Sequence, residues 1–186
     1  CIRMLNSVVE ELYDFVTLNT EIIIQRECMY RNEPRDKYLL DAAAGTPAPG
    51  GGSIAAFVGA LATTMVSMSA KFTVGKEEFK QFDSQLKKIL EECEKSRETL
   101  LSLMEEDIKV YGDVNKALEL SKSNEAERNK RSEAIQKATI MAMIVPLKAT
   151  MCCLYVLQQT RALVDIVNPN LISDVGTIPL ARFTRK

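Results

Sequence analysis

The chain has 186 residues, which is enough for one domain with a sizeable hydrophobic core. Its 24 basic and 25 acidic residues nearly cancel, so the bulk charge gives no support for binding to nucleic acid. The chain contains no histidine, which excludes Ser-His-Asp and Cys-His catalysis and zinc sites of the His-Glu-x-x-His and deaminase types. Proton transfer must therefore fall to Asp, Glu, Lys, Tyr or Cys.

The five cysteines show no Cys-x-x-Cys spacing. An odd number of cysteines without a signal peptide indicates reduced thiols, and we therefore expect a cytoplasmic protein. The first residue is Cys1 rather than Met, so a fragment of a longer protein is one interpretation of the chain.

Residues 4–30 carry apolar side chains at the helical period, and we expect one helix there although residues 17–24 are rich in β-branched types. Residues 30–37 are polar and indicate a linker. We therefore divide the chain into an N-terminal helical extension with its linker, residues 1–37, and a helical domain, residues 38–186. That domain is expected to open with a short helix that Asp36 caps and Gly45 ends.

The stretch 46–71, TPAPGGGSIAAFVGALATTMVSMSAK, is the centre of the pattern. Its two prolines stiffen an extended approach. Gly50, Gly51 and Gly52 are then expected to turn the chain with positive φ, and Ser53 to cap the helix that follows. Such a turn is a ready anion site, although a tight turn before a buried helix is the plainer interpretation. It is neither a Walker loop nor a dinucleotide fingerprint.

Small residues recur on two ridges of that helix and predict close packing against its neighbours: Gly59, Thr63 and Ser67, and Ala56, Ala60 and Thr64. The span 42–70 carries no charge, which raises the question of a membrane segment. Its first third is rich in Pro and Gly, and the rest holds Ala, Ser, Thr and Gly more than Leu, Ile and Phe. We therefore expect a buried central helix and no membrane segment.

Gly75 is expected to stop this helix, and residues 77–120 then predict a very long one with an apolar seam at steps of three and four. Asp107 falls on the seam, whereas Glu105 and Glu106 do not and are expected to be solvated. A carboxylate in an apolar stripe is costly unless it is paired or used chemically. The alternatives are that a nearby lysine satisfies Asp107 or that the seam has rotated and exposes it.

Residues 121–132 predict a polar loop and the first turn of a second long helix, which continues to about residue 167. Pro146 is expected to kink or break that helix. Residues 138–157 are apolar on all sides, which predicts a place at the centre of the core.

Ser173 and Asp174 are expected to cap a short final helix. No segment alternates with period two for long enough to form a strand. The predicted fold is therefore all-α, a helical bundle with one long antiparallel pair at its centre.

Four stretches, in order and at matching distances, resemble the cyclodeaminase/cyclohydrolase family of one-carbon folate enzymes. They are TPAPGGGSIAAFVGALATTMVSMSAKFTVGK, LMEEDIKVYGDVNKA at 103–117, AMIVPL at 142–147 and NPNLISDVG at 168–176. The resemblance covers roughly residues 38–178. The glycine-rich motif is fairly specific, and the four stretches together are strong.

The resemblance implies an all-helical subunit that works as a dimer, with Asp107 as the catalytic acid/base. It implies a tetrahydrofolate derivative as substrate and a reaction that needs no bound cofactor and no metal. The folate site would be lined by Gly50, Gly51, Gly52, Ser53, Ser173 and Asp174. Lys71 or Lys76 would face the folate glutamate tail, although surface lysines are the plainer interpretation.

The family includes formimidoyltetrahydrofolate cyclodeaminases, which release ammonia, and methenyltetrahydrofolate cyclohydrolases. Both form or open the 5,10-methenyl bridge of tetrahydrofolate, and the same proton mover serves both, so the sequence leaves the two open. Residues 1–33 have no counterpart in the resemblance, and Ser121 stands where the family usually has proline. After Asp174 the family continues with a further long helix, whereas this chain ends at Lys186. A catalytically degenerate scaffold or regulatory domain of the same fold is therefore the alternative.

Overall fold

The computed structural model describes residues 30–176, and every regular element in this part of the chain is a helix. The elements are η1 Tyr30–Asn32, α2 Arg35–Ala43, α3 Gly51–Thr73, η2 Glu77–Phe82, α4 Asp83–Glu119, α5 Glu125–Val164, η3 Pro169–Leu171 and α6 Ile172–Gly176. The helix predicted over residues 4–30 falls, apart from Tyr30, outside the described residues.

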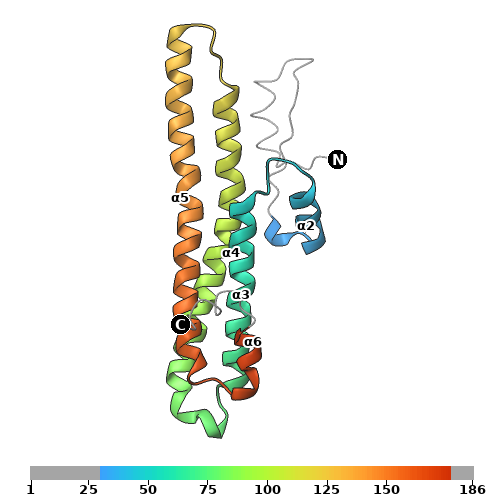
Figure 1. Ribbon diagram of the computed structural model, residues 1–186, viewed down its shortest axis with the longest axis vertical. Coiled ribbons are helices and arrows are strands. Elements are labelled where there is room, and N and C mark those ends of the chain that lie inside the picture. The colour runs from blue at the N-terminus through green and yellow to red at the C-terminus, as the bar shows by residue number, and fades with distance from the viewer. Residues whose placement is uncertain (1–29, 177–186) are drawn as a thin grey trace, which may run out of the picture.

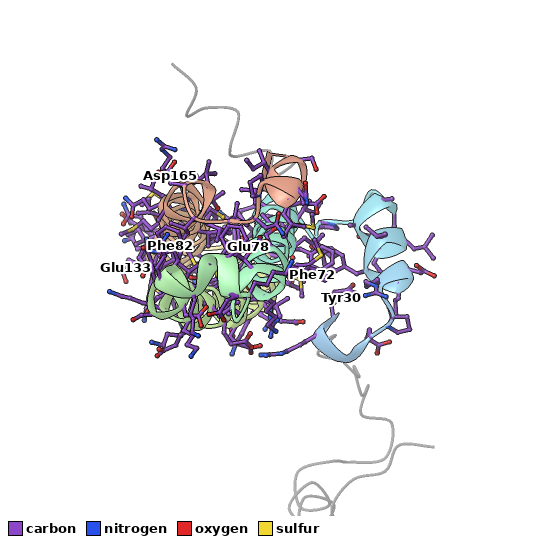
Figure 2. The ribbon with its side chains drawn as sticks, turned by 90° about the horizontal axis from the view of Figure 1, so that it is seen from below. Tyr30, Phe72, Glu78, Phe82, Glu133 and Asp165 are labelled. Carbon is purple, nitrogen blue, oxygen red and sulfur yellow. The ribbon has the colours of Figure 1, made fainter. Side chains whose placement is uncertain are left out.

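The bundle is built from α3, α4 and α5 (Figure 1). Helices α4 and α5 form the predicted long antiparallel pair, joined by a short loop. Helix α3 lies along one half of this pair, and the other half of the hairpin extends beyond it. Seen along the bundle, η1 and α2 stand beside α3 on the side away from α5 (Figure 2). The all-α prediction is confirmed.

Close approach of the three helices depends on small residues of α3. The predicted ridges are buried at Ala56, Gly59, Ala60, Thr63 and Ser67, whereas Thr64 is exposed. A Cβ placed on Gly59 would lie 2.7 Å from Cys153 Sγ of α5 and 3.3 Å from the Leu100 side chain of α4. Both neighbouring helices therefore pack against one glycine.

Helix α4 presents the predicted seam to this core, with buried residues Leu86, Ile89, Cys93, Ser96, Leu100, Leu103, Met104, Val110 and Ala117. The long helix begins at Asp83 rather than at residue 77, because η2 precedes it. Gly75, at φ +80°, follows the end of α3 as predicted, and Gly45, at φ +72°, follows the end of α2. Asp36 lies inside α2, whose N-cap is Pro34, so its predicted capping role is wrong.

The prediction that residues 138–157 lie at the centre of the core is wrong. Helix α5 buries Val145, Ala149 and Val156 in this segment. On its other sides it exposes Ile140, Met141, Met143, Leu147, Met151 and Leu154. The physical reason is that α4 and α3 cover α5 from one side only. The helix continues through Pro146 without ending there.

Helices α3 and α5 are each long and apolar enough to span a membrane by length and composition. The apolar window of α3 is 56% buried inside the bundle, as expected of a core helix. The window of α5 is 17% buried. Helix α5 therefore leaves a long apolar face uncovered in the single chain.

Candidate functional site

Helix α4 carries Asp107 to the N-terminal end of α3. The Ser53 backbone N–H donates a 2.8 Å hydrogen bond to Asp107 Oδ2. The seam residue is thus turned toward a neighbouring helix, and its partner is a main-chain amide rather than a lysine. First-turn amides have no partner within their own helix, so Asp107 supplies one from outside.

Gly52 makes this contact possible. A Cβ placed on Gly52 would lie 2.3 Å from Asp107 Oδ1 and 2.9 Å from Oδ2, closer than atoms can approach. The predicted positive φ at the glycine run is wrong: the positive-φ glycines of the described chain are Gly45 and Gly75, and Gly50 is extended at φ −100° and ψ −173°. The side chain is absent here because a carboxylate needs the space.

The predicted capping role of Ser53 is also wrong. Helix α3 begins at Gly51 with Gly50 as its N-cap, and Gly50 makes no side-chain cap. Ser53 is the third residue of the helix, and its hydroxyl shares a 3.0 Å hydrogen bond with the Tyr38 phenol. The Asp107 carboxylate takes the capping role from another helix, where the positive end of the α3 dipole favours negative charge.

The protonation of Asp107 is set by two opposing effects. Burial raises its pKa above the usual aspartate range, and the hydrogen bond from the Ser53 amide opposes that rise. The side chain is half-buried, so it keeps some access to solvent. A carboxyl group with a raised pKa can give or take a proton closer to neutral pH than an ordinary aspartate.

The two glutamates that precede Asp107 are not the freely solvated groups predicted. Glu105 is half-buried, accepts a 2.8 Å hydrogen bond from the Arg31 amide, and has its pKa raised by burial. Glu106 is half-buried and pairs with Lys148 of α5 at 3.5 Å. Glu105 therefore ties the N-terminal segment to α4 beside the site.

Tyr38 is the site residue that the sequence analysis did not identify. It is 3% exposed and packs between Tyr30 and Phe57, with ring centroids at 5.0 Å and 5.2 Å. The only signal in the sequence was an aromatic residue in a short helix before the glycine run. Its link to Ser53 depends on how α2 folds back onto α3, which no local pattern encodes.

Ser173 and Asp174 lie far from Asp107 within one chain. They belong to the first turn of α6, which begins at Ile172, so their predicted capping role is wrong. The neighbouring Val175 packs in a hydrophobic cluster with Ala70, at the opposite end of α3 from Ser53. At the helical rise of 1.5 Å per residue, Ser53 and Ala70 are about 25 Å apart along α3.

The two lysines proposed for the glutamate tail, Lys71 and Lys76, are exposed at that same far end of α3. Six residues were proposed from the sequence to line the folate site. Gly50, Gly51, Gly52 and Ser53 lie at the same end of α3 as Asp107, whereas Ser173 and Asp174 do not.

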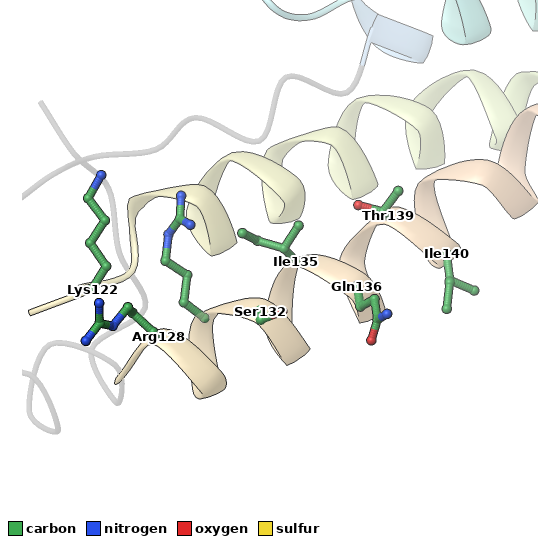
Figure 3. A pocket seen from close by; sticks show the side chains of 8 residues that line it. Lys122, Arg128, Ser132, Ile135, Gln136, Thr139 and Ile140 are labelled. Atoms are coloured by element: carbon green, nitrogen blue, oxygen red, sulfur yellow. The ribbon is translucent and has the colours of Figure 1, made fainter. Parts of the chain in front are cut away.

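The surface hollows lie along the α4–α5 hairpin. One, of about 470 Å³, sits at the start of α5 and is lined by Lys122, Arg128, Arg131 and neighbouring residues (Figure 3). A second, of about 460 Å³, includes Glu106 and Lys148. Asp107 lines neither. Between residues 30 and 176, no group of three His, Cys, Asp or Glu side chains is placed to hold a metal ion.

The chain is similar to proteins of known family. The family model described as formiminotransferase-cyclodeaminase matches residues 34–181. A methenyltetrahydrofolate cyclohydrolase from Methylorubrum extorquens is 33% identical over 155 residues, which are 83% of this chain and 74% of the relative. A formimidoyltransferase-cyclodeaminase from Mus musculus is 32% identical over 60% of this chain, which corresponds to 20% of that longer protein.

A solved structure is similar as well. The formiminotetrahydrofolate cyclodeaminase from Thermotoga maritima superposes with a TM-score of 0.71 at 26% identity, covering 82% of this chain and 73% of the other. The region that the family model matches, residues 34–181, contains both the glycine run and Asp107.

Proposed function

This chain belongs to the formiminotransferase-cyclodeaminase family, and we propose that it is a one-carbon folate enzyme in which Asp107 moves the proton. The reaction forms or opens the 5,10-methenyl bridge of tetrahydrofolate. One observation carries the proposal: the half-buried Asp107 carboxyl sits at the N-terminus of α3, bonded to the Ser53 amide in a space that only Gly52 leaves open.

The chemistry needs one group that can both give and take a proton. In cyclodeamination a folate nitrogen attacks the formimino carbon, and the departing nitrogen leaves as ammonia after it gains a proton. In hydrolysis water loses a proton as it attacks the bridging carbon, the bond from that carbon to one nitrogen then breaks, and this nitrogen gains a proton as the carbon becomes a formyl group. Burial raises the pKa of Asp107, which makes its carboxyl group a better proton acceptor than an ordinary aspartate and keeps it able to return the proton.

Electrostatics support the same residue. Methenyltetrahydrofolate carries a positive charge over the carbon that bridges two nitrogens. An ionised carboxylate beside that carbon offsets the charge, and the Ser53 amide keeps the carboxylate oriented. No step in this scheme needs a metal or a bound cofactor.

The relatives do not choose between the two reactions, because one is a cyclohydrolase and the solved structure is a cyclodeaminase. The near-ultraviolet absorbance band of methenyltetrahydrofolate distinguishes them. Growth of the band from 5-formiminotetrahydrofolate identifies a cyclodeaminase. Decay of the band faster than in buffer identifies a cyclohydrolase. A folded protein that binds reduced folate and changes neither band would instead be a degenerate scaffold of the same fold.

We further propose that the active form is a homodimer that covers the open face of α5. The exposed side chains of Ile140, Met143, Leu147, Met151 and Leu154 recur at steps of three and four, which places them on one side of the helix. An apolar stripe of this length is costly in water and has the spacing of a helix–helix seam.

The dimer also bears on the two distant residues proposed for the folate site. Because α6 lies at the far end of α3, Ser173 and Asp174 can line the Asp107 site only from a second copy of the chain.

Sedimentation tests the dimer. Leu147→Glu places a charge in the middle of the stripe and should turn a dimer into a monomer. Gln85→Glu, at an exposed position in the first turn of α4, adds the same charge away from the stripe and should leave the dimer intact. A monomeric parent protein, or a Leu147→Glu variant that still dimerises, would contradict the proposal.

A further inference from the structure

Ser53 joins three helices at one residue. Its backbone N–H donates to Asp107 Oδ2 of α4 at 2.8 Å, and its hydroxyl shares a 3.0 Å hydrogen bond with the Tyr38 phenol of α2. Ser53 is fully buried, and Tyr38 is 3% exposed. Tyr38 is therefore linked to the Asp107 carboxylate through a single buried residue.

The bond to Tyr38 is not the usual arrangement for a hydroxyl in a helix. Serine and threonine side chains commonly bond back to the carbonyl four residues earlier. In α3 this is what Thr63, Thr64, Ser67 and Thr73 do. Ser53 lies in the first turn of α3, where the carbonyl four residues earlier is outside the helix, and its hydroxyl bonds Tyr38, so this turn is tethered to α2.

The phenol is held firmly enough to serve as a tether. The Tyr38 ring packs edge-on against Tyr30, with ring centroids 5.0 Å apart, and at a tilt against Phe57, with ring centroids 5.2 Å apart. Burial raises the pKa of Tyr38, the Ser53 hydrogen bond opposes this, and the charges of Asp107 and Glu105 add to the rise. The group therefore stays a neutral phenol through the physiological pH range.

We propose that Tyr38 is a positioning residue for Asp107: its phenol holds the Ser53 hydroxyl and so keeps the first amides of α3 aimed at the carboxylate. Its meaning for catalysis rests on the proposed function of Asp107. Tyr38 is too deeply buried to meet a substrate, so it acts through Ser53 and not on the reacting atoms.

The effect of losing the Tyr38 tether depends on whether the Ser53 amide favours the protonated or the ionised form of Asp107. A hydrogen bond from an amide stabilises the ionised carboxylate, so loosening it raises the pKa of Asp107 further. Tyr38→Phe keeps the ring and removes the tether. We expect kcat to fall about two- to tenfold, in keeping with the loss of one hydrogen bond, with a smaller change in KM. The limb of the pH–rate profile that Asp107 controls moves to higher pH.

The test is a ¹³C NMR titration of the aspartate side-chain carboxyl carbons in the full chain. Asp107→Asn identifies the Asp107 resonance by its disappearance. Tyr30→Phe is the matched control, because it also removes one phenol from the same aromatic cluster, but that phenol bonds Asp41 at 2.8 Å. Both variants keep the other charged groups that face this region: Lys37 on α2, Glu105 on α4 and Arg31 on η1.

The expected result is a higher Asp107 pKa in Tyr38→Phe and an unchanged one in Tyr30→Phe. An unchanged pKa in Tyr38→Phe, or an equal change in both variants, would overturn the proposal, since α2 would then serve only as packing. Ser53→Ala removes the same bond but keeps the amide, and should act in the same direction if Tyr38→Phe fails to fold. The titration needs no turnover, so it tests the positioning role of Tyr38 whether or not the protein catalyses the folate reaction.

Discussion

Substitution of Gly52 by alanine probes the arrangement on which the site depends. The added Cβ would lie 2.3 Å from Oδ1 and 2.8 Å from Cγ of Asp107, so the carboxyl group must move away. That movement breaks the hydrogen bond from the Ser53 amide and displaces the carboxyl group proposed as the general acid/base.

The two effects of Gly52→Ala differ in size. Loss of a hydrogen bond to a charged group costs about 1.5–3 kcal/mol, and the better helix propensity of alanine returns up to about 1 kcal/mol. The free energy of unfolding should therefore fall by about 0.5–3 kcal/mol. Turnover should fall at least about 100-fold, since general acid–base catalysis contributes about 10²–10⁴.

The assay combines the methenyltetrahydrofolate absorbance band with urea unfolding. Gly112→Ala is the control, because a Cβ at this α4 position meets no atom within 4 Å. It should keep wild-type turnover and be more stable by up to about 1 kcal/mol. If Gly52→Ala turned over within threefold of the wild-type rate, the close approach of Asp107 would not be what catalysis needs.

Two further predictions concern stability. Because the folded protein raises the pKa of Asp107, its contribution to stability is present below the unfolded pKa and is lost as the pH rises through the folded one. Asp107→Asn should therefore gain stability relative to wild type as the pH rises. If urea unfolding gave the same difference in free energy of unfolding between the two proteins at every pH, this prediction would be wrong. Gly59→Ala should destabilise by about 1–3 kcal/mol, since its Cβ meets Cys153 Sγ at 2.7 Å, and adding Cys153→Ala should recover part of the loss. No recovery in thermal unfolding of the double variant would exclude this contact as the cause.

Periodicity along single helices predicted much of the fold. The steps of three and four in α4 located its buried seam and placed Asp107 on it, and the structure turns that carboxylate toward α3. The small residues of α3 predicted close packing for the same reason, because helical spacing fixes which residues share a face.

Features that depend on contacts between elements were not predictable in this way. The glycine run looked like a left-handed turn, whereas Gly52 is needed because a side chain from another helix enters its space. The apolar sides of α5 looked like core, because a local pattern does not distinguish a side that packs in the same chain from one that is left open. The distance between Asp174 and Asp107 is likewise a property of the whole bundle.

Turnover by Asp107→Asn tests the central claim most directly. The variant keeps the size of the side chain and removes its ability to move a proton. The wild-type protein should change the methenyltetrahydrofolate band from at least one of the two folate substrates, and the folded variant should leave both at the buffer rate. A wild-type rate in the variant would contradict the assignment of Asp107 as the proton mover.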